Sequence, residues 1–346
     1  MVAQVIGNHP ATITARSDSF VSLGSMQRLI VAAVVGATLL TSVPAHAGTA
    51  HRVDAAAGWL ARQMAGGERL ETEFGGVKYP DQGLTIDAIF AFAAAKDADD
   101  YADRAIAWLA KPEIADAYLG TDGESYAGAH AKLAVAARVK GQNPRAFAGR
   151  DLVAGLKALQ APSGRYTDRS QFGDFSNAFT QSYAVFALKD TKAASYLAGS
   201  QCPDGGFPVT FETSPCVSDV DATAIVVQAL RTAGRPTGRA VTWLESKQQA
   251  DGGFPSAQAG SNANSTGLAA QVLRGERAAK ARDYLRSLQV GCDAPVADRG
   301  AVAFDAAGFD PATATRATAQ AVLGLTHANV ATLRGGGRDG APALRC

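Results

Sequence analysis

A helical segment with a leucine at the same position recurs six times along this chain, at intervals of 41 to 49 residues. The aligned leucines are Leu60, Leu109, Leu156, Leu197, Leu244 and Leu285. In the last four copies a glutamine follows four residues later. Repeats of this length are typical of architectures in which each unit buries its apolar face against its neighbours. The chain is therefore expected to fold as stacked copies of one unit.

Each copy continues through a turn into a second helical run. The turn is clearest in QCPDGGFP at 201–208 and QQADGGFP at 248–255, where two glycines supply positive backbone angles and the proline prevents a return to helix. The second runs are rich in alanine and leucine and begin at Thr85, Tyr126, Thr180, Thr223, Ser265 and Ala317. Their composition predicts helices that are packed on most sides. The unit is a helix, a Gly-rich loop and a helix.

Six helical hairpins can form either an open solenoid or a closed ring with an inner and an outer layer. Neither end of the chain carries a distinct polar capping unit, which favours the closed ring. The predicted fold is all-α, a single (α/α)6 barrel, or toroid, built from six helical-hairpin repeats over residues 48–330. Residues 331–346 are predicted to form a Gly-rich C-terminal tail.

The N-terminal region has the pattern of a secretory signal. Arg28 precedes the apolar stretch 29–40, and Ala45-His46-Ala47 is a small-residue cleavage pattern. The apolar stretch of about 12 residues is shorter than the ~20 that span a bilayer, so no permanent membrane span is expected. Residues 1–47 are predicted to be a signal peptide, with the true start at Met26, and the mature protein is predicted to be secreted.

Charge and cysteine content limit the classes of partner. The chain is 47% hydrophobic. Removing residues 1–47 leaves equal numbers of basic and acidic residues, so no nucleic acid partner is expected. Four cysteines in an exported chain favour disulfides, and of three possible pairings we prefer Cys202 with Cys216 and Cys292 with Cys346. No metal-ligand spacing is present, and no metal or cofactor is expected.

The glutamine turns carry a family resemblance. The spacing Q-x-x-x-G-x-aromatic in QCPDGGF and QQADGGF resembles the QW repeat of the squalene cyclase and prenyltransferase superfamily, over residues from about 54 to 325. The resemblance implies an α/α toroid. Physically, Gln201 and Gln248 can bond free backbone groups of the following turn, and Phe207 and Phe254 can pack on the neighbouring repeat. These residues are expected to be structural.

The segment DVDATA at 219–224 resembles the D-x-D-D-T-A segment of class II terpene and squalene–hopene cyclases. In that family the middle aspartate protonates an isoprenoid double bond, so the resemblance implies Asp221 as the acid and Asp219 as its neighbour. The family's remaining aspartate is replaced by Ala222. Aromatic residues, which stabilise carbocations, are only 7% of the chain, and the family's enzymes build their cavity between two barrels. These differences count against cyclisation.

A simpler interpretation of this segment is helix capping, because Asp and Asn side chains accept from the free N–H groups of a first turn. The neighbouring repeat has Asn262 and Asn264 at the positions of Asp219 and Asp221, which keeps capping and loses the acid. We therefore expect Asp221 mainly to start a helix. The candidates to face a ligand at this end of the barrel are Asp219, Asp221, Thr223, Asn264 and Thr266.

Other candidates are weaker. His130 lies in an alanine-rich run and is expected to be a satisfied core histidine. Asp81 and Asp87 could form a glycosidase-like acid pair, but capping and a solvated face are the favoured interpretation. Cys292 and His327 do not match the zinc pattern of protein prenyltransferases.

The preferred function is a binding module without catalysis, which holds a small apolar ligand or an extracellular protein at one mouth of the ring. Vitamin B12 carriers use a similar six-hairpin barrel, an analogy at the level of fold. The alternative is a class II terpene-cyclase-like enzyme that protonates an isoprenoid with Asp221. A third possibility is a structural surface protein whose irregular segments 161–178 and 290–312 are contact loops.

Overall fold

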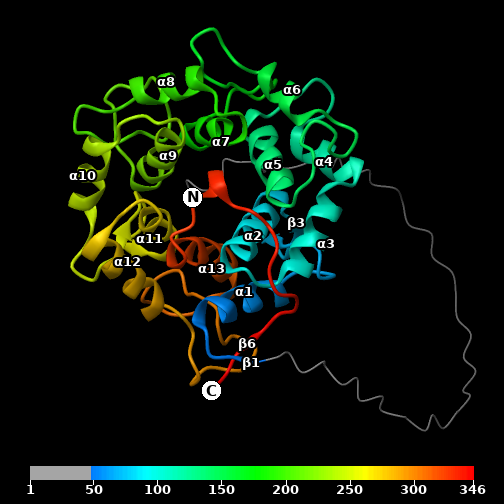
Figure 1. Ribbon diagram of the computed structural model, residues 1–346, viewed down its shortest axis with the longest axis vertical. Helices are drawn as coiled ribbons and strands as arrows, with labels where there is room; N and C mark the ends of the chain where they lie inside the picture. Colours follow the sequence, from blue (N-terminus) through cyan, green and yellow to red (C-terminus); the bar gives the residue numbers. More distant parts are fainter. Residues whose placement is uncertain (1–47) are drawn as a thin grey trace, which may run out of the picture.

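The computed structural model describes residues 48–346, so the predicted signal peptide and Met26 lie outside the described part. The described chain is mostly helical, and its helices form two concentric layers around a centre (Figure 1). The inner helices are α2 (Gln82–Ala95), α5 (Ala127–Val139), α7 (Ala178–Leu188), α9 (Val220–Thr232), α11 (Ala263–Ala270) and α13 (Pro311–Leu325). Each inner helix contacts the next one in chain order, and α13 contacts α2, which closes the ring.

The outer layer covers these helices from outside (Figure 1). It consists of α1 (Arg52–Arg62), α3 (Asp99–Leu109), α4 (Pro112–Leu119), α6 (Leu152–Lys157), α8 (Thr191–Gly199), α10 (Gly238–Lys247) and α12 (Gly275–Ser287). All twelve predicted helical runs are helices, and α4 is an additional one that the repeat pattern did not predict. It begins with Pro112, whose fixed φ and missing N–H suit the first position of a helix.

Small residues bring the inner helices close together. A Cβ added at Gly267 of α11 would lie 2.5 Å from the carbonyl oxygen of Gln320, and one added at Gly324 of α13 would lie 2.8 Å from Cα of Gly267. The two backbones therefore touch, and no larger side chain fits between them. Helix α2 is buried along almost its whole length, whereas α12 exposes much of its surface, as expected for an inner and an outer element.

Short strands occur only in the connections and near the two ends of the described chain. Strand β1 (Gly48–Thr49) pairs in parallel with β6 (Ala343–Leu344). Antiparallel pairs join β2 (Glu71–Phe74) to β3 (Val77–Pro80) and β4 (Phe254–Pro255) to β5 (Ser261–Asn262).

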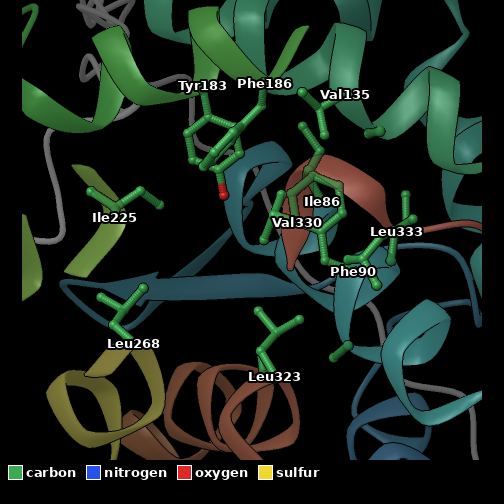
Figure 2. Close-up of a cluster of buried hydrophobic side chains, with 14 of the residues drawn as sticks. Ile86, Phe90, Val135, Tyr183, Phe186, Ile225, Leu268, Leu323, Val330 and Leu333 are labelled. Atoms are coloured by element: carbon green, nitrogen blue, oxygen red, sulfur yellow. The ribbon is translucent and has the colours of Figure 1, made fainter. Parts of the chain in front are cut away.

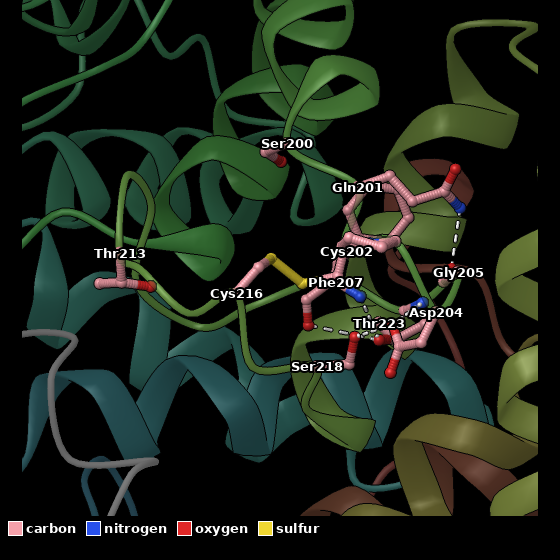
Figure 3. Close-up of a disulfide and its surroundings, with 12 residues drawn as sticks. Ser200, Gln201, Cys202, Asp204, Gly205, Phe207, Thr213, Cys216, Ser218 and Thr223 are labelled. Atoms are coloured by element: carbon pink, nitrogen blue, oxygen red, sulfur yellow. Dashed lines mark hydrogen bonds between the residues drawn. A yellow bond between two sulfur atoms is a disulfide. The ribbon is translucent and has the colours of Figure 1, made fainter.

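The repeat turns are held by the side chains that recur in the sequence (Figure 3). Gln201 Nε2 donates to the carbonyl oxygen of Gly205 at 2.8 Å, and Gln248 Nε2 donates to that of Gly252 at 2.9 Å. Phe207 is fully buried in the core. The structural role expected for these glutamines and aromatic residues is therefore confirmed by their contacts.

Both predicted disulfides are present. Cys202 is bonded to Cys216, which closes the loop around the Asp-Gly-Gly turn (Figure 3), and Cys292 is bonded to Cys346 at the end of the chain. Disulfides are typical of oxidising environments, so these bonds agree with an extracytoplasmic protein. Among residues 48–346, no helix is long and apolar enough to cross a membrane.

The C-terminal segment closes one end of the ring. The short helix η2 (Val330–Thr332) packs on α7 and α9 near the centre (Figure 1), and Val330 and Leu333 lie close to Phe90 (Figure 2). The chain then crosses the ends of α5 and α2, where Gly335 N donates to Val139 O. The barrel is thus blocked at the end where the inner helices finish.

Candidate functional site

A cavity of about 70 Å³ lies inside the ring, between the first turns of the inner helices and Val330 of η2. Its polar lining residues are Asp81, Asp87, Lys132, Asn177, Asp221, Asn264, Gln271, Arg316 and Gln320. Its apolar lining residues include Leu84, Phe179, Tyr183, Ile225, Leu268, Leu323 and Val330. The wall is therefore mixed in character, not uniformly apolar.

The polar and apolar residues are ordered along the helices. On α9 and α11 the lining residues Asp221 and Asn264 are each followed four residues later by an aliphatic one, Ile225 and Leu268. A spacing of four places both side chains on the same face of a helix, one turn apart. Ile225, Leu268 and Leu323 lie around one open space together with the ring of Tyr183 (Figure 2). On these two helices the lining is therefore polar at the first turn and aliphatic one turn deeper.

Helix capping in the DVDATA segment is performed by Asp219. Its backbone is extended (φ −124°, ψ 142°), and its carboxylate accepts from Ala222 N at 2.8 Å. Asn262 caps α11 in the same way, accepting from Ser265 N at 2.9 Å. The prediction that Asp221 starts the helix is wrong, because the helix begins one residue earlier, at Val220. Asp221 is the second residue of the helix and lines the cavity.

Burial changes the ionisation of Asp221. Removal from water raises its pKa to about 7, and the negative charge of Asp219 adds to this effect, while the nearby Ser265 hydroxyl opposes it. Part of the side chain lines the cavity, but Oδ1 is buried and has no hydrogen-bond partner among residues 48–346. The carboxyl of Asp221 is therefore about half protonated at neutral pH. Burial also raises the pKa of Asp219.

Two amide oxygens at the cavity also lack a hydrogen-bond partner, as Asp221 Oδ1 does. Asn264 Oδ1 and Gln320 Oε1 are buried without a partner in the described part of the chain, and both residues line the same cavity as Asp221. A buried polar atom that lacks a hydrogen bond destabilises a protein by about 1–3 kcal/mol. Three such acceptors on the neighbouring helices α9, α11 and α13 point to a ligand that supplies donors.

Two of the five candidate ligand-facing residues have another role. Thr223 Oγ1 accepts from Phe207 N at 2.8 Å, and Thr266 Oγ1 accepts from Phe254 N at 2.8 Å. Both threonines are fully buried and do not line the cavity. Their hydroxyls satisfy the backbone of the repeat turns, which corrects the expectation that they face a ligand. Asp219, as the helix cap, does not line the cavity either.

An ion-pair group forms the opposite wall. Lys132 Nζ donates to Asp87 Oδ1 at 2.8 Å and to the carbonyl oxygen of Gly83 at 2.9 Å. The guanidinium of Arg316 lies 3.9 Å from both Asp81 Oδ2 and Asp87 Oδ2, too far for a hydrogen bond. Asp81 caps α2, as expected, by accepting from Leu84 N at 2.8 Å.

The expectation of a solvated face for Asp87 is wrong, because Asp87 is buried and paired with Lys132. Lys132, Arg316 and Gln320 were not predicted as site residues. The signal that could have found Lys132 is a single charge within the alanine-rich run AGAHAKLAVAA, since a charged residue inside a buried helix needs a partner. Arg316 and Gln320 have no comparable signal, because α13 begins with a polar stretch.

The remaining candidates lie elsewhere. His130 is buried, as expected, and burial lowers its pKa to about 4. Its Nε2 lies 3.1 Å from Ser125 Oγ, but Nδ1 has no hydrogen-bond partner among the described residues, so the expected satisfied histidine is confirmed only in part. His327 Nδ1 lies 2.8 Å from Ala270 O. Among residues 48–346, no group of three or more His, Cys, Asp or Glu side chains could hold a metal ion.

Solved structures resemble this fold at low sequence identity. A type II terpene cyclase, MstE from Scytonema, matches with a TM-score of 0.60 and 14% identity, over 80% of this chain and 96% of that chain. A protein from Actinoplanes matches with a TM-score of 0.58 and 15% identity, over 81% and 99%. An alpha-amylase from Clostridium perfringens matches with a TM-score of 0.56 and 12% identity, over 81% and 98%. No family model and no curated protein matches the chain.

These likenesses support a terpenoid-cyclase-like toroid fold. The described activities of the neighbours differ, since one is a terpene cyclase and another an amylase. At this level of identity the likeness concerns the fold alone, and function depends on the site.

Proposed function

We propose that this protein is a secreted (α/α)6 toroid of six helical-hairpin repeats that binds a small amphiphilic ligand in its central cavity without chemical conversion. The observation that carries the proposal is the part of the cavity wall formed by α9 and α11, where unpaired oxygens of Asp221 and Asn264 lie one turn before Ile225 and Leu268. Such a wall fits a ligand with a polar head and a short aliphatic chain. The polar head group distinguishes this ligand from the wholly apolar one expected from the sequence.

The size of the cavity supports a small ligand. Its volume is about 70 Å³, whereas an apolar cavity of roughly 150 Å³ holds one benzene molecule. An isoprenoid with twenty carbons is several times larger than benzene and does not fit. The natural ligand is either a molecule of a few heavy atoms or the end of a larger one.

A type II terpene-cyclase activity is the second candidate. Asp221 favours it, because the resemblance of DVDATA implies this carboxyl as the acid, and it lines the cavity and keeps its proton in part at neutral pH. The single barrel does not argue against cyclase activity. The match covers 96% of the MstE chain, so a type II cyclase can be built on a fold of this size.

The chemistry of the cavity wall disfavours a cyclase. Carbocations need aromatic faces, and the aromatic residues that line the cavity are Phe179 and Tyr183. A binding function requires neither a larger cavity nor a different lining.

Three probes with the same three-carbon chain test the binding function: propan-1-ol, propylammonium and propionate. Each is titrated against the full-length mature protein and followed by ligand-observed NMR. We expect at least one probe to bind the wild type and none to bind Leu268→Phe, whose larger side chain fills the cavity. Leu273→Phe, on a buried leucine that does not line the cavity, is the matched control for packing damage. Failure of all three probes to bind the wild type would contradict the proposal.

The cyclase candidate has its own test. The protein is incubated with geranylgeranyl diphosphate at pH 6, where Asp221 is mostly protonated. Because a cyclisation started by protonation keeps the diphosphate on the product, the mixture is treated with phosphatase before organic extracts are examined by gas chromatography and mass spectrometry. We expect no cyclic product. A cyclic product that forms with the wild type and is lost in Asp221→Asn would establish the enzyme instead.

A further inference from the structure

The charges that line the cavity do not cancel. Three carboxyl groups line it, those of Asp81, Asp87 and Asp221, against two cations, Lys132 and Arg316. Lys132 pairs directly with Asp87, and Arg316 lies beside Asp81 and Asp87. Asp221 is therefore the carboxyl without a cationic partner among the described residues. When it ionises, the lining carries one net negative charge.

Asn264 lies beside this charge, because α11 is the helix next to α9, whereas Gln320 lies on α13, one turn from Arg316. Asp221 Oδ1, Asn264 Oδ1 and Gln320 Oε1 come from three consecutive inner helices, and none has a hydrogen bond within residues 48–346. An amide can present either its oxygen or its NH₂ group, but an ionised carboxylate only accepts. Because the ionised carboxylate of Asp221 can only accept, the ligand must supply the hydrogen-bond donor.

We infer that the head group of the ligand is a primary ammonium ion that donates to Asp221 and Asn264, with its aliphatic chain directed toward Ile225 and Leu268. The inference rests on the proposed function and names the ligand class of the same cavity. An ammonium carries three N–H donors and one positive charge, which match the acceptor oxygens of these two side chains and the one uncompensated carboxylate. A neutral alcohol would supply a single donor, and a carboxylate would be repelled.

The ionisation of Asp221 makes this binding depend on pH. The titratable groups around Asp221 are Asp219 on its own helix, Tyr183 on α7, and Asp81, Asp87, Lys132 and Arg316 across the cavity, while α11 contributes the neutral Asn264 and Ser265. Only the ionised carboxylate attracts an ammonium ion. With a pKa of about 7, its ionised fraction rises about tenfold from pH 6 to pH 8, and the apparent affinity rises by the same factor.

Isothermal titration calorimetry with propylammonium chloride tests this inference on the mature protein. At pH 8 we expect saturable binding to the wild type and at least a tenfold weaker affinity for Asp221→Asn. From pH 6 to pH 8 the wild-type affinity is expected to increase about tenfold. At pH 7 the measured heat should change with the ionisation enthalpy of the buffer, because binding releases the proton of Asp221.

The matched control is Asp219→Asn, the same chemical change two residues away. Asn is as good a helix cap as Asp, and residue 219 does not line the cavity, so this variant should bind propylammonium at pH 8 within threefold of the wild type. Equal affinity of Asp221→Asn and the wild type would overturn the inference, as would a pH-independent affinity of the wild type.

Titrations of propan-1-ol and propionate separate this inference from the proposed function. If either binds in the cavity as tightly as propylammonium, and Leu268→Phe abolishes that binding, the ammonium head group is wrong and the binding function stands. If none of the three probes binds the wild type, both are wrong.

Discussion

Asp221 and Asn264 are the second residues of the neighbouring inner helices α9 and α11, and the side-chain Oδ1 of each is buried without a hydrogen-bond partner in the described part of the chain. The residues directly before the two helices, Asp219 and Asn262, cap them. In both repeats the residue before the helix therefore caps it, and the second residue of the helix is available to bind a ligand.

The first prediction concerns Asp221→Asn and stability. The pKa of Asp221 is about 7 in the folded protein, above about 3.9 in an unfolded chain, so the folded state holds a proton that the unfolded state releases. The contribution of Asp221 to wild-type stability should therefore fall as pH rises from about 4 to 7, by an amount on the order of 4 kcal/mol, and then level off. His130, whose pKa is lowered to about 4, has the opposite effect in both proteins, so the difference between wild type and variant isolates Asp221. The Asn variant does not titrate and should be more stable than the wild type at pH 8.

Urea unfolding at pH 4.5 and pH 8 measures this difference. We expect the variant to gain about 2–4 kcal/mol over the wild type at pH 8 and much less at pH 4.5. Asp283→Asn, an exposed aspartate on α12, is the control and should change stability by less than about 0.5 kcal/mol. A loss of stability for Asp221→Asn at pH 8 would contradict the position assigned to Asp221.

The second prediction separates the cap from the site. Asp219→Ala removes the acceptor for Ala222 N and should destabilise the protein by about 1 kcal/mol, as should Asn262→Ala in the neighbouring repeat. Thermal unfolding of each variant gives the measurement. If Asp219→Ala left the free energy of unfolding unchanged while Asp221→Ala lowered it strongly, Asp221 and not Asp219 would be the helix cap.

The third prediction concerns the repeat threonines. Thr223→Val keeps the shape of the side chain but leaves the buried N–H of Phe207 without its acceptor, so we expect a loss of about 1–3 kcal/mol. Thr266→Val should behave in the same way, because it removes the equivalent bond to Phe254 N. Propylammonium affinity should stay at the wild-type value in both variants, and a tenfold loss would mean that the threonines contact the ligand.

The fourth prediction concerns the ion pair on the far wall of the cavity. Lys132→Met leaves the carboxylate of Asp87 buried with only Arg316 nearby, at 3.9 Å, and should destabilise the protein by about 3 kcal/mol. The double variant Asp87→Leu/Lys132→Met removes both charges and should recover most of that loss. Chemical denaturation of both variants is the measurement, and an equal loss in both would show that packing dominates.

Much of the fold could be predicted because its determinants are local and repeated. The leucine period and the Asp-Gly-Gly turns located the helices of both layers, and the glutamine spacing predicted the bonds that Gln201 and Gln248 make to their turns. The even cysteine count and short spacing led to the correct pairing of Cys202 with Cys216. The extra helix α4 was missed because it occurs in only one repeat.

The site was harder to predict, since it depends on which side chains converge from distant repeats. The DVDATA segment drew attention to Asp221, but the sequence could not show that Asp219 supplies the cap and leaves Asp221 facing the cavity. Lys132 meets Asp87 across the neighbouring helices α5 and α2, and Arg316 on α13 reaches Asp87 only when the ring closes. That convergence is set by the tertiary structure and has no local pattern.

The most direct test of the account is the pKa of Asp221, measured by carbon-detected NMR on protein labelled with ¹³C at the aspartate carboxyl groups. Asp221→Asn assigns the signal by its absence. We predict a pKa of about 7 in the free protein and a clear decrease in the presence of saturating propylammonium, with no comparable change for saturating propionate. A pKa near 4 in the free protein, or one that propylammonium leaves unchanged, would contradict a buried, ligand-binding carboxyl at this position.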